Sequence, residues 1–258
     1  MALQNLGEAD ARLRGMREAI DLLQRTVMIY DKILEAVDVK EDLYNSKGIV
    51  LQVLGEIYMR MGEVETSIKM FTGAIVSYDE ALGITSDKFK EAWNNKGLVL
   101  QELGGILIEK RRIEGAVNIL IEALTAYNNA IMITDNKYPN AWYNKGDTLR
   151  MLGELFYRIN YKSKAMSALK EPIITYEMAL KLTENKYIDT WNEKGLSLYL
   201  IGKISLESNE LILAQEILCE SLKCFEIVLK LGGNYWKDTT TKNIRIVKSI
   251  LESNDPKC

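Results

Sequence analysis

The sequence predicts an all-α fold, an α-solenoid in which antiparallel helix hairpins stack on one another. Lysine–glycine pairs stand 49 residues apart, at Lys47, Lys96, Lys145 and Lys194. A second mark keeps the same step, at Tyr78, Tyr127, Tyr176 and Phe225. Self-similarity at one period across most of a chain is typical of stacked units that bury their apolar faces on one another. With only 3 prolines in 258 residues, long stretches are free to form helix.

The expected elements are a terminal helix at each end and four full repeats between them. Apolar residues within 1–40 alternate steps of three and four, as in the buried stripe of a helix; they are Leu13, Met16, Ile20, Leu23, Val27, Tyr30, Leu34 and Val37. The repeats are residues 42–88, 91–137, 140–186 and 189–232. Residues 238–253 form a more polar capping helix that begins at Asp238, a favourable N-cap residue.

Each repeat is expected to contain two helices of roughly 20 residues, or about 30 Å. In the second repeat, Gly97 and Gly104 stand seven apart on one face of the first helix. Glycine inside a helix costs about 1 kcal/mol relative to alanine. We therefore expect these glycines to let a neighbouring helix approach closely. Their counterparts are Gly48 and Gly55, Gly146 and Gly153, and Gly195 and Gly202.

These marks resemble the tetratricopeptide repeat, whose signature is W-x-x-L-G-x-x-Y, then A-x-x-x-F, then P. The second repeat matches through Trp93 and Gly97, and again through Ala123 and Tyr127. Lysine replaces the signature leucine, and the 49-residue step exceeds the family's period of about 34 residues. The extra residues either lengthen two helices or add a third, and the unbroken apolar spacing favours lengthening.

The resemblance covers residues 42–232 and implies a single repeat domain over 1–258, coiled into a right-handed superhelix. Proteins of this family act as non-catalytic scaffolds that bind a peptide or a partner helix on a concave face lined by first helices. Amide side chains suit that role because they both donate to and accept from a peptide backbone. The candidate peptide-binding residues are Asn45, Gln52, Asn94, Gln101, Tyr143, Asp147, Arg150, Asn192 and Tyr199. Alternatively, the asparagines simply start first helices.

The residues with which some family members clamp the tails of heat-shock chaperones are incomplete. Asn95 and Asn144 match clamp asparagines, but Asn45, Ile49 and Asn140 stand where basic residues are required. The sequence therefore does not predict binding of such tails.

Two other functions are compatible with parts of the pattern. The ladder of Lys47, Lys96, Lys145 and Lys194 would suit an acidic segment or a nucleic-acid backbone. A net charge of −3 argues against nucleic acid, because neutralising phosphates takes a concentrated basic face. The other alternative is a self-associating structural module, although the polar helix at 238–253 favours a monomer.

No catalytic, metal-binding or cofactor-binding residue is predicted. The chain contains no histidine, which removes the commonest general base and metal ligand. It has no phosphate-binding or dinucleotide-binding glycine motif, and its 3 cysteines form no C-x-x-C pair. Neither a signal peptide nor an apolar run of about 18 residues is present, so we expect a cytoplasmic protein with no membrane association.

Overall fold

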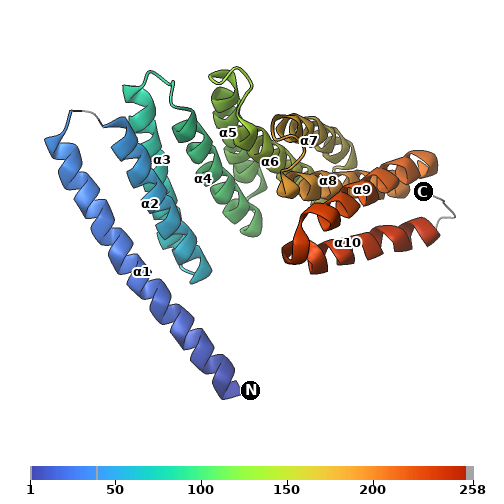
Figure 1. The fold of residues 1–258 in the computed structure, drawn as a ribbon, viewed down its shortest axis with the longest axis horizontal. Helices are drawn as coiled ribbons and strands as arrows, with labels where there is room; N and C mark the ends of the chain where they lie inside the picture. The colour runs from blue at the N-terminus through green and yellow to red at the C-terminus, as the bar shows by residue number, and fades with distance from the viewer. Residues whose placement is uncertain (1, 39, 254–258) are drawn as a thin grey trace. The chain divides into compact units, whose positions relative to one another are not determined.

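The chain folds as consecutive helices. The computed structural model describes residues 2–38 and 40–253, and the side chains of 14–38, 40–232 and 237–253. No strand occurs in this part of the chain (Figure 1). The helices are α1 (Ala2–Ala36), α2 (Glu41–Arg60), α3 (Val64–Ile84), α4 (Lys90–Glu109), α5 (Ile113–Met132), α6 (Pro139–Arg158), α7 (Lys162–Leu182), α8 (Ile188–Glu207), α9 (Leu211–Leu231) and α10 (Gly233–Ser253). The predicted all-α solenoid of antiparallel hairpins is confirmed.

Two compact units divide the chain, one ending at Ile133 and the other beginning at Thr134. In the first unit, α1 packs on α2, and the hairpins α2/α3 and α4/α5 follow, with α3 packed on α4. In the second unit, the hairpins α6/α7 and α8/α9 pack through α7 and α8, and α10 covers α9. Each helix is thus buried by its neighbours in sequence, as in other repeat proteins. The right-handed coil of the whole chain stays a prediction.

Each hairpin consists of two helices of 20 or 21 residues, with no third helix between them in the described residues. The residues beyond the usual family length therefore extend both helices. The last helix differs from expectation, because α10 begins at Gly233 and Asp238 lies inside it. No proline between these two residues stops a helix, so the helix extends to Gly233. The prediction relied on the N-cap preference of Asp238 and therefore put the start of the helix too late.

A tryptophan ties the start of a first helix to the turn before it. The Trp93 indole Nε1 donates to the carbonyl oxygen of Asp87 at 2.9 Å, and Asp87 has a left-handed φ of 64°. The same bond recurs from Trp142 to Asn136 (3.1 Å) and from Trp191 to Asn185 (3.0 Å). The signature aromatic residue thus fixes the backbone turn between hairpins.

Glycines of the first helices make room for large side chains of the second helices. A Cβ on Gly97 would lie 2.6 Å from Cε1 of Tyr127, and one on Gly104 would lie 2.6 Å from Cδ2 of Leu120. Both distances are too short for real carbon atoms. The corresponding pairs are Gly48–Tyr78, Gly55–Phe71, Gly146–Tyr176, Gly153–Leu169, Gly195–Phe225 and Gly202–Leu218. The expected close approach is confirmed, and it occurs within each hairpin.

We expect Gly97→Ala to lower the free energy of unfolding by about 1–3 kcal/mol, because the new methyl group displaces the fully buried ring of Tyr127. Urea unfolding followed by circular dichroism measures the loss. The matched control is Gly83→Ala in α3, where nothing lies within 4 Å of the added Cβ. Alanine's helix preference should there leave stability unchanged or raise it by up to about 1 kcal/mol. Equal losses in the two variants would contradict the close-approach explanation.

Candidate functional site

Every candidate residue lies on the first helix of a hairpin. Asn45 and Gln52 lie on α2, Asn94 and Gln101 on α4, Tyr143, Asp147 and Arg150 on α6, and Asn192 and Tyr199 on α8. Their environments differ between the two units. The glutamines bind core tyrosines, Asn45 and Asn192 bind neighbouring side chains, and the residues of α6 meet in a charged cluster.

The two glutamines hold core tyrosines. The hydroxyl of Tyr78 donates to Oε1 of Gln52 at 3.1 Å, and that of Tyr127 donates to Oε1 of Gln101 at 3.1 Å. Both tyrosines are fully buried, so their hydroxyls need a partner inside the protein. Burial, with Glu56 nearby, raises the pKa of Tyr78, so this hydroxyl keeps the proton that it donates. In both hairpins the side-chain oxygen of the glutamine therefore already accepts a hydrogen bond from a core tyrosine.

The third hairpin lacks this bond. Arg150 stands where the first two hairpins have Gln52 and Gln101, and a guanidinium can only donate. Tyr176 is fully buried, and its hydroxyl has no hydrogen-bond partner among the described residues. Burial raises the pKa of this hydroxyl well above its ordinary value, so the group stays neutral.

Tyr78→Phe and Tyr176→Phe should therefore differ. Tyr78→Phe leaves the amide of Gln52 without its donor and should lower the free energy of unfolding by about 1 kcal/mol. Tyr176→Phe removes a buried hydroxyl that has no partner among the described residues, so stability should stay unchanged or rise. Urea unfolding of both variants provides the comparison, and an equal loss in the two would show that Tyr176 is bonded after all.

The asparagines are more buried than the floor of an open groove would be. Asn94 is 5% exposed and Asn192 is 4% exposed. Asn45 accepts a hydrogen bond from Nδ2 of Asn95 at 3.1 Å, which joins α2 to α4. Nδ2 of Asn192 donates to Oε1 of Glu193 at 3.1 Å. Contact of these amides with a peptide stays a prediction.

Charged residues of α6 and α8 meet around Arg150. The guanidinium pairs with Asp147 (Nη2 to Oδ1, 2.6 Å), with Glu154, and with Glu193 of α8 (Nε to Oε2, 2.8 Å). The side chains of Arg150 and Glu193 keep 16% and 15% of their surface exposed. We refer to Tyr143, Asp147, Arg150, Glu154 and Glu193 as the α6–α8 cluster.

Tyrosine rings adjoin the carboxylates of this cluster. The ring centroids of Tyr143 and Tyr187 lie 5.1 Å apart at an interplanar angle of 33°, and those of Tyr143 and Tyr176 lie 6.3 Å apart at 45°. Tilted pairs at these separations are favourable for aromatic rings. Tyr143 and Tyr187 are partly exposed, so aromatic surface beside the carboxylates reaches solvent.

Burial and neighbouring charges shift the pKa values of the groups in this cluster. Burial raises the pKa of Glu193, Arg150 lowers it and Asp147 raises it again, with a net rise. Burial alone would lower the pKa of Arg150, but the surrounding carboxylates raise it overall. Burial also raises the pKa of Tyr143, and Glu193 and Asp147 add to the rise. Burial is the largest cause of the shifts of Glu193 and Tyr143, and the carboxylates around Arg150 more than offset its burial.

The raised pKa of Glu193 predicts a specific pH dependence of stability. In the unfolded chain this pKa is near 4.5, so the folded protein takes up the proton first as the pH falls. Wild type should therefore gain stability relative to Glu193→Gln between about pH 7 and about pH 4.5, and should lose that gain as the pH rises through the folded-state pKa. Urea unfolding of both proteins across this range measures the difference. A difference that stays constant, or that grows with rising pH, would contradict the shift.

The sequence pointed to three of the five residues of this cluster, Tyr143, Asp147 and Arg150, and gave no sign of Glu154 and Glu193. A signal was present at Asp147, where the other repeats carry Ile49, Leu98 and Leu196. A charge at an otherwise apolar position is a departure that the repeat itself does not require. The pairing of Glu193 with Arg150 depends on the packing of α6 beside α8, which no local pattern contains.

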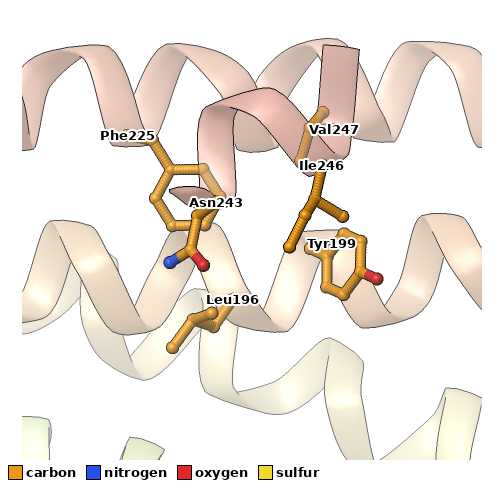
Figure 2. Close-up of a pocket in the computed structure, with 6 residues that line it drawn as sticks. All are labelled: Leu196, Tyr199, Phe225, Asn243, Ile246 and Val247. Carbon is orange, nitrogen blue, oxygen red and sulfur yellow. The ribbon is translucent and has the colours of Figure 1, made fainter. Parts of the chain in front are cut away.

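A small apolar pocket lies beside Tyr199 (Figure 2). It has a volume of about 40 Å³ and is lined by Leu196 and Tyr199 of α8, Phe225 of α9, and Asn243, Ile246 and Val247 of α10. Leu196 and Tyr199 hold the positions in their repeat that Asp147 and Arg150 hold in the one before. The pocket therefore lies at the positions of α8 that correspond to Asp147 and Arg150 on α6, in the same unit.

The four ladder lysines are paired within the chain. Their ammonium groups contact carboxylates at Lys47–Asp31 (2.5 Å), Lys96–Asp79 (2.5 Å), Lys145–Glu171 (3.6 Å) and Lys194–Glu177 (2.8 Å). Lys96, Lys145 and Lys194 also lie over the ring of the signature tryptophan, 5.5 to 5.8 Å from its centroid. Lysine can thus replace the signature leucine, because its aliphatic stem packs on the protein while its ammonium group pairs with a carboxylate and lies over an aromatic ring. This pairing leaves the ladder little free positive charge.

Other reactive features are scarce in the described residues. No group of side chains there has the composition of a metal site. Among the helices described, none combines the length and the apolar character needed to cross a bilayer. Cys224 is a free, buried thiol, and burial raises its pKa to about 12, so it does not act as a thiolate nucleophile.

No family model matches the chain, and no curated protein sequence matches it. Solved structures do resemble it. The crystal structure of BtubC (BKLC) from P. vanneervenii has a TM-score of 0.53 and 12% identity, and the match covers 94% of each chain. TTC0263, a thermophilic TPR protein in Thermus thermophilus, has a TM-score of 0.43 and 13% identity over 91% of this chain and 99% of that chain. Pseudomonas aeruginosa pilF has a TM-score of 0.42 and 16% identity over 95% of each chain.

At these identities the resemblance concerns the fold alone. Together with the consecutive hairpins and their glycine–aromatic contacts, it makes this chain a helical-repeat protein with a tetratricopeptide-like fold.

Proposed function

We propose that the chain is a non-catalytic scaffold or adaptor of the cytoplasm that binds a peptide or a partner helix on the faces of its first helices. One observation carries the proposal. In the second unit, the partly exposed α6–α8 cluster is followed on α8 by the apolar pocket at Tyr199. Polar groups that orient a ligand beside an apolar anchor point are the combination that peptide-binding sites use.

The spacing of the two features suits an extended polypeptide. Packed helices lie roughly 10 Å apart, and an extended chain advances by about 3.3 Å per residue. A ligand crossing from α6 to α8 would therefore place a polar residue on the cluster and an apolar residue in the pocket about three positions apart.

The alternatives have less support. The pairing of Lys47, Lys96, Lys145 and Lys194 with carboxylates disfavours a ladder that binds nucleic acid or acidic segments. A catalytic role lacks candidate residues, since the chain has no histidine and Cys224 is a buried thiol. Self-association stays an alternative to the expected monomer, and light scattering would separate the two.

Selection of peptides from a random display library, with the whole chain as bait, tests the proposal. We expect the selected peptides to lose at least about tenfold in affinity for Tyr199→Glu, because the charge closes an apolar pocket. Calorimetry measures the affinity, and an unchanged melting temperature shows that the fold is intact.

The matched control is Ile174→Glu, which adds the same charge to the second helix α7 at a side chain that is 62% exposed. It should change the affinity by less than about twofold. Recovery of no peptide, or equal binding to wild type and Tyr199→Glu, would rule out this face as the docking site.

A further inference from the structure

We propose that the α6–α8 cluster binds a basic side chain, an arginine or a lysine, of the polypeptide that docks on the second unit; the inference rests on the proposed function. It assigns a charge preference to one place on the ligand. Surplus carboxylates, and buried oxygen atoms that lack hydrogen-bond partners in the described residues, support it.

The carboxylates around the cluster outnumber the cations. Asp147, Glu154 and Glu193 all contact Arg150, and Asp189 acts on the neighbouring ring of Tyr143. A second guanidinium, that of Arg158, is 67% exposed and lies 3.9 Å from Glu154. Even without Asp147, the carboxylates of Glu154, Glu193 and Asp189 at or beside the cluster outnumber the guanidinium groups of Arg150 and Arg158. A third cation would therefore be drawn to a site where burial weakens screening by water.

The fold does not need these charges. At the position of Asp147 the other hairpins have Ile49, Leu98 and Leu196, and at the position of Arg150 they have Gln52, Gln101 and Tyr199. Three of four hairpins thus form the same helix pair without a charged cluster. Burying charges is costly, so their presence in one hairpin calls for a reason outside the packing of the repeat.

A buried hydroxyl aimed at the cluster supplies an independent observation. The ring of Tyr176 lies against Gly146, and Arg150 follows on the same face of α6, one turn later. In the first two hairpins the corresponding hydroxyl reaches the side chain at that next position, as Tyr78 reaches Gln52, and the fourth hairpin has Phe225 instead of a tyrosine. The Tyr176 hydroxyl, fully buried, has no hydrogen-bond partner among the described residues.

The buried atoms beside the α6–α8 cluster that lack hydrogen-bond partners within the described residues indicate which hydrogen-bonding groups the ligand must supply. Oδ1 of Asn192 is buried without a partner in the described part of the chain, while Nδ2 of the same amide binds Glu193. Oδ1 of Asn192 can thus accept a hydrogen bond, and so can the oxygen of the Tyr176 hydroxyl, which also donates; both lie beside carboxylates that only accept. A guanidinium offers five N–H donors and an ammonium three, and neither competes as an acceptor.

Aromatic surface favours the same class of ligand. The partly exposed rings of Tyr143 and Tyr187, 5.1 Å apart, adjoin Glu193 and Asp189. A cation is attracted to the face of a tyrosine, and carboxylates beside the ring strengthen that attraction. The chain already uses this arrangement internally, where Lys194 lies over the ring of Trp191 and pairs with Glu177.

The test uses the whole chain and three acetylated, amidated tripeptides: Gly-Arg-Gly, Gly-citrulline-Gly and Gly-Glu-Gly. Citrulline keeps the shape of arginine without its charge. Amide chemical shifts of labelled protein are followed during titration at low and at physiological salt. We expect the arginine peptide to change the amide chemical shifts of α6 and of the first half of α8 until the site is saturated. The citrulline peptide should bind at least about tenfold more weakly. Added salt should weaken the binding of the arginine peptide only.

Two variants locate the effect. Glu193→Gln should weaken the arginine peptide at least about tenfold, and Asp189→Asn provides a second test if the first variant is poorly folded. Glu226→Gln, which removes the same charge from an exposed position on α9, should change binding by less than about twofold. Equal binding of arginine and citrulline peptides, or equal binding to wild type and Glu193→Gln, would overturn the proposal.

The outcomes also separate this inference from the proposed function. Display-selected peptides that depend on Tyr199 but carry no basic residue would leave the docking face standing and overturn the basic subsite. Conversely, saturable binding of the arginine peptide at the cluster, with no display-selected peptide sensitive to Tyr199→Glu, would support the subsite and overturn the wider groove.

Discussion

The contact between a glycine of the first helix and an aromatic ring of the second governs the arrangement of every hairpin. The ring of Tyr127 lies where a Cβ of Gly97 would be, so the two helices approach more closely than any other residue would permit. This contact also fixes the rotation of the first helix. With Gly97 turned inward, Gln101 one turn later comes within reach of the tyrosine hydroxyl. The outward faces of the first helices follow from the same constraint.

Around that contact, residues whose regular spacing suggests ligand binding instead stabilise the fold. The tryptophans donate to carbonyl oxygens of left-handed turn residues, as Trp93 does to Asp87. The lysines cover the tryptophan rings and pair with carboxylates of other helices, as Lys96 does with Asp79. Regular spacing is therefore weak evidence for a binding ladder in a repeat protein, because each repeat has the same structural needs.

Function is better sought where one repeat departs from the others. Asp147 stands at a position that is apolar in the other repeats, and Arg150 stands at one that is glutamine in the first two. As a result, the hydroxyl of Tyr176 has no internal acceptor among the described residues. Such local losses of stability are tolerated when surrounding packing is strong, and they gather at sites that bind or react. The apolar pocket formed by Tyr199 and α10 extends this departure to the neighbouring first helix.

The sequence by itself determined the helical class, the hairpin as the repeating unit and the role of paired glycines such as Gly97 and Gly104. These follow from periodicity and from backbone sterics, which are local. It also placed all candidate residues on first helices, because helical spacing assigns faces. Only the tertiary structure decided which of them are free to act. Gln52 is occupied by a tyrosine 26 residues away, and Arg150 meets Glu193 from the next hairpin. Hydrogen bonds and charge balance depend on what lies across the helix interface, and that information is absent from any single segment.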